Sequence, residues 1–376
     1  MFFCIGLKRM YNKKVSNESF NNFILKGNVS LLDSFTPCVI ERKVGGDVFF
    51  EIQKNTEHHF INERIIKFIF SRIPINSLAC GFVKDKSYFD FLKYHINGYY
   101  FLRLDIKKFF HSISFYEIKS LIKDNFSSDK GNSKYSAFDI ALMSVTHKVS
   151  NNFSDEDLRG RNILPIGFPS SPVISNILFR RIDILIQKFC EDKKITYSRY
   201  ADDLLFSSLN GNFLHGEQFE KEISIFISNL SLKLKNKKRK ASENTISLNG
   251  YVIHNNKQKK LNFFNVYKED PVGTIRLSDK KLKVIKKLVS YIKKDKPPIF
   301  IMEKLFNLSF DNFKFKNRND ITFYSKYAHD QLQNKLKGYR SYLVSLIVFD
   351  SKHGCVDKNC LNTVKDLVSI IEKKIN

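Results

Sequence analysis

The sequence predicts a globular chain that mixes helices and strands, and three observations lead to this prediction. Hydrophobic residues make up 43% and charged residues 27% of the 376 positions, as in ordinary globular proteins. Apolar residues recur at helical spacing in residues 59–72 and 172–189. Aromatic and aliphatic runs typical of strands fill residues 99–105 and much of 195–208. With no Pro-rich or Gly/Ser-rich linker, we expect two or three subdomains of one packed body.

The net charge of +25 limits the partners of the chain, because so large an excess attracts nucleic acid or an anionic membrane surface. No apolar run approaches the roughly 20 residues that span a bilayer. The opening apolar stretch, residues 2–7, is too short for a signal-peptide core. We therefore expect a cytoplasmic protein without membrane contact. Residues 271–376 hold 22 Lys plus Arg against 10 Asp plus Glu, nearly half of the excess.

The elements follow in order along the chain. The strand at residues 99–105 ends on Asp105, helices are expected at 136–149 and 216–230, and residues 151–161 are polar and loop-like. The next helix is expected to have Ser171 as its cap and Pro172 at its first position. The basic run 233–240 precedes a short strand near residue 252, and the pattern from residue 277 onward is helical and basic.

Three carboxylates are the strongest chemical signal. Two strand-like runs flank Ala201, Asp202 and Asp203, which predicts a hairpin with carboxylates at its turn. Together with Asp105 they would form an acidic cluster that a cation must neutralise, and carboxylates suit Mg²⁺. Two such ions activate an attacking oxygen and stabilise a leaving one in displacement at phosphorus. The alternative is that Asp202 and Asp203 are ordinary turn residues.

A second group of metal-ligand residue types, His353, Cys355 and Cys360, lies near the C-terminus. It has no evident fourth ligand, and the six cysteines include no Cys-x-x-Cys pair. We therefore favour buried or idle thiols over a zinc site.

The motifs resemble those of reverse transcriptases. Residues 200–203 read Tyr-Ala-Asp-Asp, the signature tetrapeptide of that family, and residues 101–113 resemble its first catalytic motif. Residues 164–176 resemble the motif that supports the templating pair and the incoming nucleotide. The three occur in the family order, so the combined signal is strong.

Resemblance extends over nearly the whole chain. Residues 233–240, 248–253 and 338–342 resemble the basic motif, the primer grip and the thumb of bacterial retron-type enzymes. Phe91 and Leu92 replace the Asn-Ala pair typical of retron enzymes. The resemblance implies an α+β, right-hand polymerase fold with an RRM-like antiparallel palm sheet. Its expected parts are fingers at 1–98, a palm at 99–270 with a fingers insertion around 114–160, and a helical basic thumb at 271–376.

The resemblance also implies residue roles in catalysis. Asp105 and Asp202 would hold two Mg²⁺ ions, which Mn²⁺ can replace, with the Ile106 carbonyl as a further ligand. Asp203 would complete the cluster with weaker coordination. Lys238 best matches the lysine that protonates departing pyrophosphate, although the density of lysines leaves a solvated surface as the alternative.

Further roles concern the nucleotide and the nucleic acid. Phe110 matches the steric gate against ribonucleotides, with a core aromatic as the alternative; Tyr200 belongs to the substrate site. Gly167 and Pro169 would shape a loop against the nascent pair. Lys107 and Lys108 are either triphosphate contacts or solvated, and Arg199 is either a phosphate contact or a structural ion-pair partner. Nucleic-acid contacts are also expected at Gly250, Tyr339 and Arg340.

The expected activity is RNA-directed DNA synthesis from dNTPs, with an RNA template or non-coding RNA and a DNA product as partners. By elimination the chain resembles a defence-associated or abortive-infection enzyme, with retron enzymes that make msDNA a close second and a partner protein encoded nearby as a further expectation. Untemplated or protein-primed synthesis is an alternative, because the metal chemistry is common to both. A non-catalytic RNA-binding scaffold is disfavoured, since clustered carboxylates repel phosphates.

Overall fold

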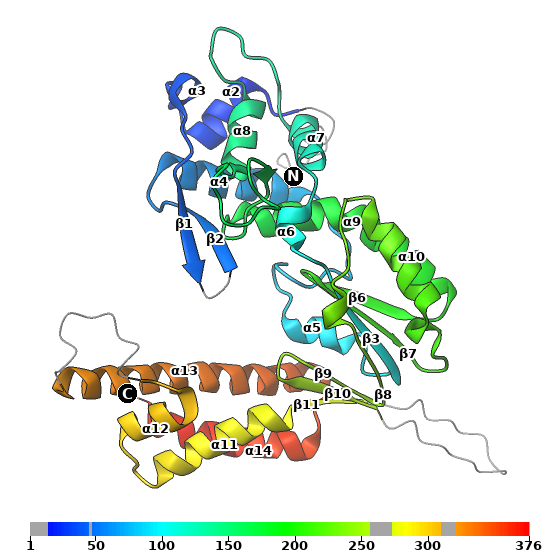
Figure 1. Cartoon of the computed structure of the whole chain (residues 1–376), viewed down its shortest axis with the longest axis vertical. Helices are drawn as coiled ribbons and strands as arrows, with labels where there is room; N and C mark the ends of the chain where they lie inside the picture. Colours follow the sequence, from blue (N-terminus) through cyan, green and yellow to red (C-terminus); the bar gives the residue numbers. More distant parts are fainter. Residues whose placement is uncertain (1–13, 45–46, 256–272, 310–320, 376) are drawn as a thin grey trace, which may run out of the picture. The chain divides into compact units, whose positions relative to one another are not determined.

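The computed structural model describes residues 14–44, 47–255, 273–309 and 321–375 (Figure 1). They divide into two compact units. The first unit contains the described residues up to 94 together with residues 102–241, and the second contains residues 95–101 and the described residues from 242 onward.

Helices of the first unit alternate with short strands. Its helices are α2 (Asn17–Phe20), the π-helix η1 (Asn21–Leu25), α3 (Leu31–Ser34), α4 (Glu57–Phe68), α5 (Tyr88–Lys93), α6 (Phe109–Ser112), α7 (Phe115–Asn125), α8 (Ala137–Val145), α9 (Ser170–Asp192) and α10 (Glu217–Ser228). Its strands are β1 (Val39–Val44), β2 (Asp47–Ile52), β4 (His147–Lys148), β5 (Asn162–Ile163), β6 (Thr196–Tyr200) and β7 (Asp203–Ser208). Residues 102–105 of β3 (Tyr100–Asp105) and 240–241 of β8 (Lys240–Glu243) also belong to it. Short 3₁₀ turns lie at Phe70–Arg72, Phe213–His215 and Asn236–Lys238.

A four-stranded sheet positions the expected site. Its strand order is β6-β7-β3-β8, so β3 lies between the second hairpin strand and β8. Strands β6 and β7 form the predicted antiparallel hairpin, in which Tyr200 faces Asp203. Helix α9 packs on β6 and on α10 (Figure 1). Every residue of β7 is buried, including the apolar residues 204–206 at its centre.

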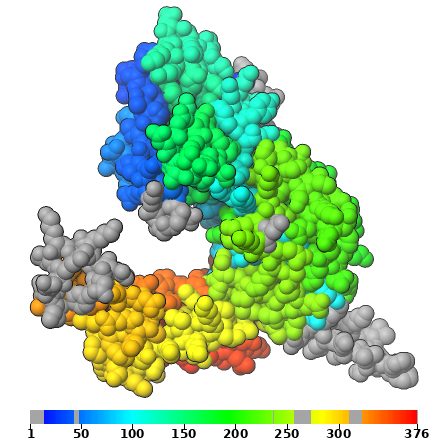
Figure 2. All heavy atoms as spheres, viewed as in Figure 1, coloured from blue at the N-terminus to red at the C-terminus, as the bar shows by residue number. Residues whose placement is uncertain are grey.

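Helices from distant parts of the sequence build the remaining core of the first unit. Helix α4 packs on α8 and α9, and α7 packs on α8. The N-terminal residues in blue and the segment around residue 140 form a continuous surface in Figure 2. In this core the buried ring of Phe126 meets the rings of Phe20 and Phe70 edge to face. These edge-to-face contacts show how the many phenylalanines fill the core.

The second unit combines a small sheet with helices. Strands β9 (Thr245–Leu248), β10 (Tyr251–His254) and β11 (Thr274–Leu277) pair antiparallel with β10 in the middle. The helices are α11 (Asp279–Lys293), α12 (Pro298–Phe306), α13 (Ile321–His353) and α14 (Lys358–Glu372). Helix α13 packs on α12 and α14. The described residues from Asp279 onward are thus mostly helical, as the sequence pattern predicts.

Some boundaries differ from the sequence prediction. Helix α9 begins at Ser170 with Pro169 as its N-cap, because the Ser171 hydroxyl donates to the Pro165 carbonyl oxygen instead of capping the helix. Helix α8 ends at Val145, earlier than expected, since the extended backbone of Thr146 leads into β4. In the described parts of the chain, no helix is both long and apolar enough to cross a membrane.

Candidate active site

The end of β3 meets the turn of the β6–β7 hairpin. The Ile106 amide donates to the Asp202 carbonyl oxygen at 3.0 Å, and the Lys235 amide donates to the Asp105 carbonyl oxygen at 2.7 Å. These bonds fix the turn and the basic run on either side of Asp105. Asp105 and Asp203 are buried, and Asp202 is half-buried. The structure therefore brings the three predicted carboxylates together.

Burial and mutual repulsion shift the pKa values of two carboxylates in the acidic cluster. Burial raises the pKa of Asp202, and the negative charge of Asp105 raises it further. Burial likewise raises the pKa of Asp203, with additional repulsion from Asp202 and Asp105. Such mutual repulsion disfavours three negative charges in one place unless cations accompany them.

Two cations of the chain already contact the cluster. Lys238 Nζ lies 2.7 Å from Asp105 Oδ2, so the predicted Lys238 lies beside the acidic cluster. Arg103 Nε donates to Asp203 Oδ1 at 2.9 Å, and its Nη2 lies 4.0 Å from Asp105. Sequence reasoning missed Arg103. Its signal was a lone charge in an apolar strand, two residues before Asp105 and thus on the same face.

Arg199 contacts the turn of the β6–β7 hairpin from inside the protein. Its Nε and Nη2 donate to the two carboxylate oxygens of Asp183 on α9 at 2.9 and 2.8 Å, and both side chains are fully buried. Its Nη1 donates to the Ala201 carbonyl oxygen at 3.2 Å. The expectation that Arg199 contacts nucleic acid is therefore wrong, and the alternative of a structural ion pair holds, because the guanidinium has no access to a phosphate.

Residues 78–81, which precede α5, form backbone hydrogen bonds and close contacts next to the same turn. The Cys80 amide donates to the Arg199 carbonyl oxygen at 2.7 Å, and the Arg199 amide donates to that of Leu78 at 3.0 Å. A Cβ at Gly81 would lie 2.5 Å from the Ala201 amide nitrogen, so only glycine fits. Ala201 itself has φ +56°, a left-handed conformation that is strained for alanine.

The loop before α9 is tied to strand β2. The Phe50 amide donates to the Ile166 carbonyl oxygen at 2.8 Å, and the Ile166 amide donates to His111 Nε2 at 3.2 Å. Gly167 has φ +111°, and a Cβ there would lie 2.5 Å from the Phe50 carbonyl oxygen. Gly167 thus permits close approach of the chain's own backbone. Pro169 is exposed beside it.

Phe110 and Tyr200 belong to one group of aromatic rings, because both contact the ring of Phe82. The Phe110 ring lies 5.2 Å from that of Phe109 and 6.1 Å from that of Phe82, measured between centroids. Phe109 is buried, whereas Phe110 is half-buried. The Tyr200 ring packs on Tyr88 at 4.9 Å. Of the two adjacent phenylalanines, Phe109 fills the core and Phe110 borders the surface.

Comparisons with known proteins agree with this geometry. The model of the family described as "Reverse transcriptase (RNA-dependent DNA polymerase)" matches residues 54–264, more than half of the chain and the whole acidic cluster. The chain belongs to the reverse transcriptase family. This membership and the sheet that carries the carboxylates confirm the predicted α+β polymerase fold.

Individual reverse transcriptases show the same likeness. The chain is 33% identical over 150 residues to the retron Ec83 reverse transcriptase and 30% identical over 145 residues to the retron Ec73 reverse transcriptase, both of Escherichia coli. These regions cover 39% and 37% of this chain and 45% and 43% of the relatives. The chain therefore spans less than half the length of the curated relatives it matches.

Solved structures of telomerase are similar as well. That of Candida albicans in complex with a telomeric RNA fragment gives a TM-score of 0.43 at 11% identity and covers 96% of this chain and 68% of its own. Truncated apo telomerase of Candida tropicalis gives 0.39 at 15% identity, covering 63% and 58%. These TM-scores are too low to add to the assignment.

Reverse transcriptase family membership implies a divalent metal cofactor in general terms, and the donor set of the acidic cluster fits one. Three crowded carboxylates supply the oxygen donors that hard cations favour, and the pKa values of two of them, Asp202 and Asp203, are raised by burial. Among the described residues, no group of three or more His, Cys, Asp and Glu side chains is arranged as a metal site. Lys238 and Arg103 form ion pairs with Asp105 and Asp203, respectively.

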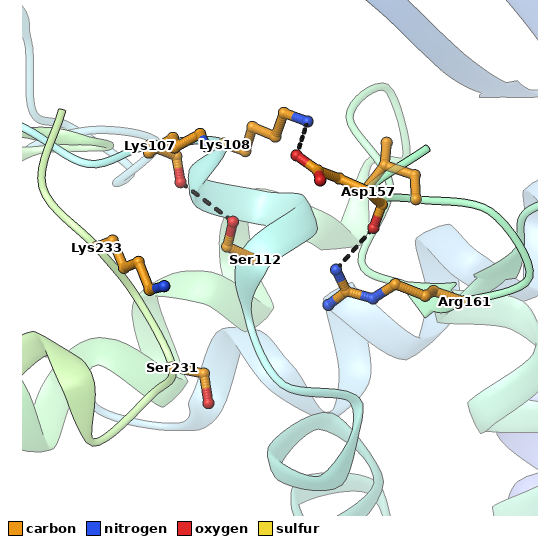
Figure 3. A pocket seen from close by; sticks show the side chains of 8 residues that line it. Lys107, Lys108, Ser112, Asp157, Arg161, Ser231 and Lys233 are labelled. Carbon is orange, nitrogen blue, oxygen red and sulfur yellow. Dashed lines mark hydrogen bonds and ion pairs between the residues drawn. The ribbon is translucent and has the colours of Figure 1, made fainter. Parts of the chain in front are cut away.

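The remaining predicted site residues lie in two places. Lys108 binds Asp155 and Asp157 in ion pairs of 2.7 and 2.9 Å, while Lys107 is exposed next to it (Figure 3). Both lysines line one small pocket of this reverse transcriptase.

Gly250, Tyr339 and Arg340 belong to the second unit. The Tyr342 hydroxyl donates to the Gly250 carbonyl oxygen at 3.3 Å, and Lys281 Nζ lies 5.0 Å from the Tyr339 ring centroid. Arg340 is half-buried and donates to Glu372 at 2.7 Å. Gly250 and Arg340 thus have roles in packing and ion pairing of this unit. A contact of these residues with nucleic acid stays a prediction.

Proposed function

We propose that the protein is an RNA-directed DNA polymerase that adds dNTPs to a 3′-hydroxyl with two Mg²⁺ ions. The bond from the Ile106 amide to the Asp202 carbonyl carries this proposal, because it brings carboxylates of β3 and of the hairpin turn into one cluster. The 3′-oxygen attacks the α-phosphorus, its proton leaves to solvent, and the bond from that phosphorus to the bridging oxygen breaks. Pyrophosphate then departs.

Each residue of the acidic cluster has a distinct part in this proposal. Asp105 and Asp202, with the Ile106 carbonyl, would hold the divalent ions, which lower the pKa of the attacking hydroxyl and balance charge on the leaving group. Asp203 contributes less directly, because Arg103 already neutralises it. Lys238 supplies a proton or positive charge to pyrophosphate, and it reaches the cluster from the basic run.

Selection of the nucleotide falls to the residues around the cluster. The Phe110 ring would exclude a ribose 2′-hydroxyl by collision. Tyr200 and the loop of Gly167 and Pro169 would support the nascent base pair. The Gly167 loop is held in place by the bonds of Ile166 to Phe50 and His111.

We further propose fingers at residues 1–98, a palm at 99–270 with the insertion around 114–160, and a thumb at 271–376. The surplus of positive charge in the thumb suits a duplex backbone. The similarity to retron enzymes favours copying of a non-coding RNA in the bacterial cytoplasm. A role in antiphage defence, with a partner protein encoded nearby, is part of the same proposal.

Primer extension on an RNA template tests the polymerase assignment. Asp202→Asn should abolish extension while leaving affinity for the primer–template largely intact, because it removes a charge from the cluster without touching a basic surface. Asp192→Asn, on the exposed end of α9, is the control and should extend normally. Full synthesis by Asp202→Asn would refute the assignment.

Sequencing of nucleic acid that copurifies with the active protein tests the templating mode. A defined complementary RNA–DNA pair supports templated copying. Heterogeneous or homopolymeric DNA attached to the protein would instead establish untemplated, protein-primed synthesis.

A further inference from the structure

Phe82 lies in the loop that leads to α5, and it combines an exposed ring with an unusual backbone. The residue is 53% exposed, and its φ of +59° is left-handed. A single exposed apolar side chain is common on protein surfaces. Left-handed backbone is rare at a bulky residue, however, because it costs free energy, and it persists where neighbouring contacts fix it. The position of Phe82 is therefore determined by its surroundings.

Hydrogen bonds on both sides of Phe82 hold this loop in place. Lys86 Nζ donates to the Ala79 carbonyl oxygen at 3.0 Å, which joins the two sides of the loop. Buried Asn176 on α9 donates from its side-chain amide to the Gly81 carbonyl oxygen at 2.9 Å. Because Gly81 precedes Phe82 directly, the second bond fixes the point from which the Phe82 side chain extends.

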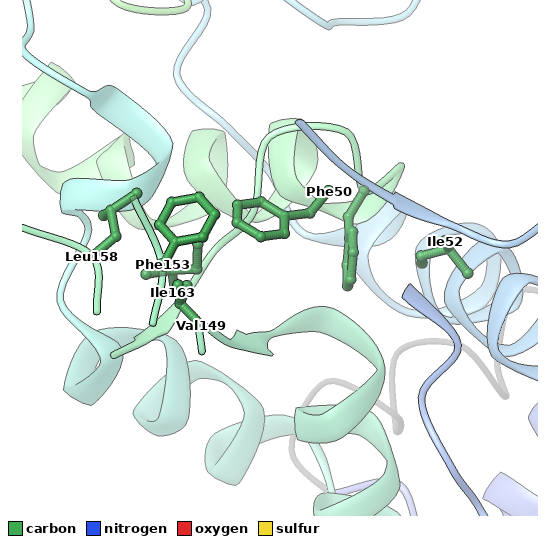
Figure 4. Packing of buried hydrophobic residues seen from close by; sticks show 7 residues of the cluster. Phe50, Ile52, Val149, Phe153, Leu158 and Ile163 are labelled. Atoms are coloured by element: carbon green, nitrogen blue, oxygen red, sulfur yellow. The ribbon is translucent and has the colours of Figure 1, made fainter. Parts of the chain in front are cut away.

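The backbone around Phe110 is fixed by the neighbours of that residue in α6. The Phe109 ring meets the Phe179 ring of α9 at 5.8 Å between centroids. The His111 ring meets the Phe50 ring edge to face at 5.9 Å. Phe50 in turn belongs to a cluster of buried apolar residues (Figure 4). These contacts anchor α6 on both sides of Phe110, so the ring of Phe110 is the part that can still change its orientation.

The rings of two residues restrain that orientation. Among the described residues, the Phe110 ring contacts only the rings of Phe109, at 5.2 Å, and Phe82, at 6.1 Å. Phe109 is the preceding residue and lies in the core. Phe82 is the contact that a separate segment of the chain supplies. Without it, Phe110 could adopt other rotamers at little cost, because its ring is only half-buried.

We infer that Phe82 is a positioning residue for sugar selection: its ring keeps the Phe110 ring in the orientation that excludes a ribose 2′-hydroxyl. The inference rests on the proposed function, in which Phe110 acts by collision. Collision discriminates between sugars only if the ring cannot move aside, since a ring that rotates away removes the clash. Loss of the Phe82 ring should therefore relax sugar selection although Phe110 itself remains.

Primer extension by the full chain tests this inference through the ratio of kcat/KM for rNTP to kcat/KM for dNTP. Loss of folded protein lowers both values equally and leaves the ratio unchanged. Phe82→Ala should raise the ratio about three- to tenfold, as expected for the loss of one aromatic pair. Phe82→Gly, which accepts the left-handed backbone, should do the same, and Phe82→Tyr should keep the wild-type ratio. Tyr116→Ala removes an exposed ring of α7 and is the control.

The combination with Phe110→Ala shows whether Phe82 acts through Phe110. If it does, Phe82→Ala/Phe110→Ala should match Phe110→Ala within about twofold, because the ring to be positioned is already gone. If Phe82→Ala raises the ratio equally in the presence and absence of the Phe110 ring, Phe82 acts on the nucleotide by itself and the inference is overturned.

Failure of the inference and failure of the proposed function give different results. An unchanged ratio in Phe82→Ala and Phe82→Gly, with a raised ratio in Phe110→Ala, overturns the inference and leaves Phe110 as the steric gate. An equal rise in Tyr116→Ala and Phe82→Ala also overturns it. An unchanged ratio in all of these variants refutes the gate and the inference together. A chain that extends no primer on an RNA template would refute the polymerase function itself, and with it the inference.

Discussion

The guanidinium of Arg199 binds both carboxylate oxygens of Asp183 in the interior of the first unit, with neither side chain exposed. The Tyr197 hydroxyl donates to the same carboxylate at 2.8 Å. Because Arg199 also donates to the Ala201 carbonyl oxygen, this buried pair connects helix α9 to the turn that carries Asp202.

We predict that Asp183→Asn lowers the free energy of unfolding by about 3–5 kcal/mol, since it leaves a buried guanidinium without its counterion. The triple variant Asp183→Leu/Tyr197→Phe/Arg199→Met removes all three polar groups and should recover most of that loss. It should nevertheless extend primers at least tenfold more slowly, because Ala201 loses its donor. Urea unfolding and primer extension measure the two effects. Normal extension by the triple variant would limit the pair to a stabilising role.

Phe110→Ala should increase ribonucleotide incorporation about tenfold or more, which corresponds to about 1.4 kcal/mol of discrimination. The reason is that the half-buried ring is the bulky group proposed to meet a 2′-hydroxyl. Competition between dNTP and rNTP on one primer measures the ratio. Phe213→Ala removes an exposed ring elsewhere and serves as the control. Unchanged sugar selectivity would show that Phe110 is a packing residue and not the steric gate.

Lys238→Met should tighten Mn²⁺ binding in the absence of nucleotide, because the ammonium and the metal compete for Asp105. Asp105 is buried but the Lys238 side chain is 45% exposed, so solvent screens the ion pair and the gain should be modest, about fivefold. Electron paramagnetic resonance of free Mn²⁺ reports the affinity. Lys237→Met makes the same charge change at an exposed lysine that forms no ion pair with Asp105, Asp202 or Asp203, and it should leave the Mn²⁺ affinity unaltered. Equal affinities of wild type and Lys238→Met would contradict this competition.

Acid should destabilise the protein partly through His111. Burial lowers the pKa of this histidine from 6.5 to about 4, so the unfolded chain takes up the proton first as the pH falls. Stability is therefore lost between about pH 6.5 and 4, by ~3 kcal/mol at most from this group. His111→Gln should show a shallower decline in urea unfolding across that range, while exposed His329→Gln should match wild type. Parallel pH profiles of His111→Gln and wild type would refute the assignment.

The carboxylates were predictable because each belongs to a local pattern. Asp105 ends an apolar strand, and Asp202 and Asp203 occupy a hairpin turn, so short stretches of sequence locate all three. Arg103 and Asp183 were not predictable as partners. Their roles depend on pairings across 100 and 16 residues, with Asp203 and Arg199 respectively.

Some predictions from local sequence patterns were wrong because tertiary contacts determine the structure at those residues. Ser171 has the side chain of a helix cap, yet its hydroxyl donates to Pro165 and the helix begins earlier. Lys107, Arg161 and Lys233 lie far apart in sequence, and only the fold places them around one pocket. Sequence alone gave no reason to separate them from the other basic residues of a strongly cationic chain.

The contact between Gly167 and Phe50 also bears on motion. Suppose that the β1–β2 hairpin rotated while residues 165–167 stayed in place. The bond from the Phe50 amide to the Ile166 carbonyl would then break, or the Phe50 carbonyl would collide with Gly167. The hairpin and this loop therefore move as one piece. Through the bond from the Ile166 amide to His111, that piece extends to helix α6. Any closing of the hairpin over a nucleotide would therefore displace helix α6, which begins four residues after Asp105.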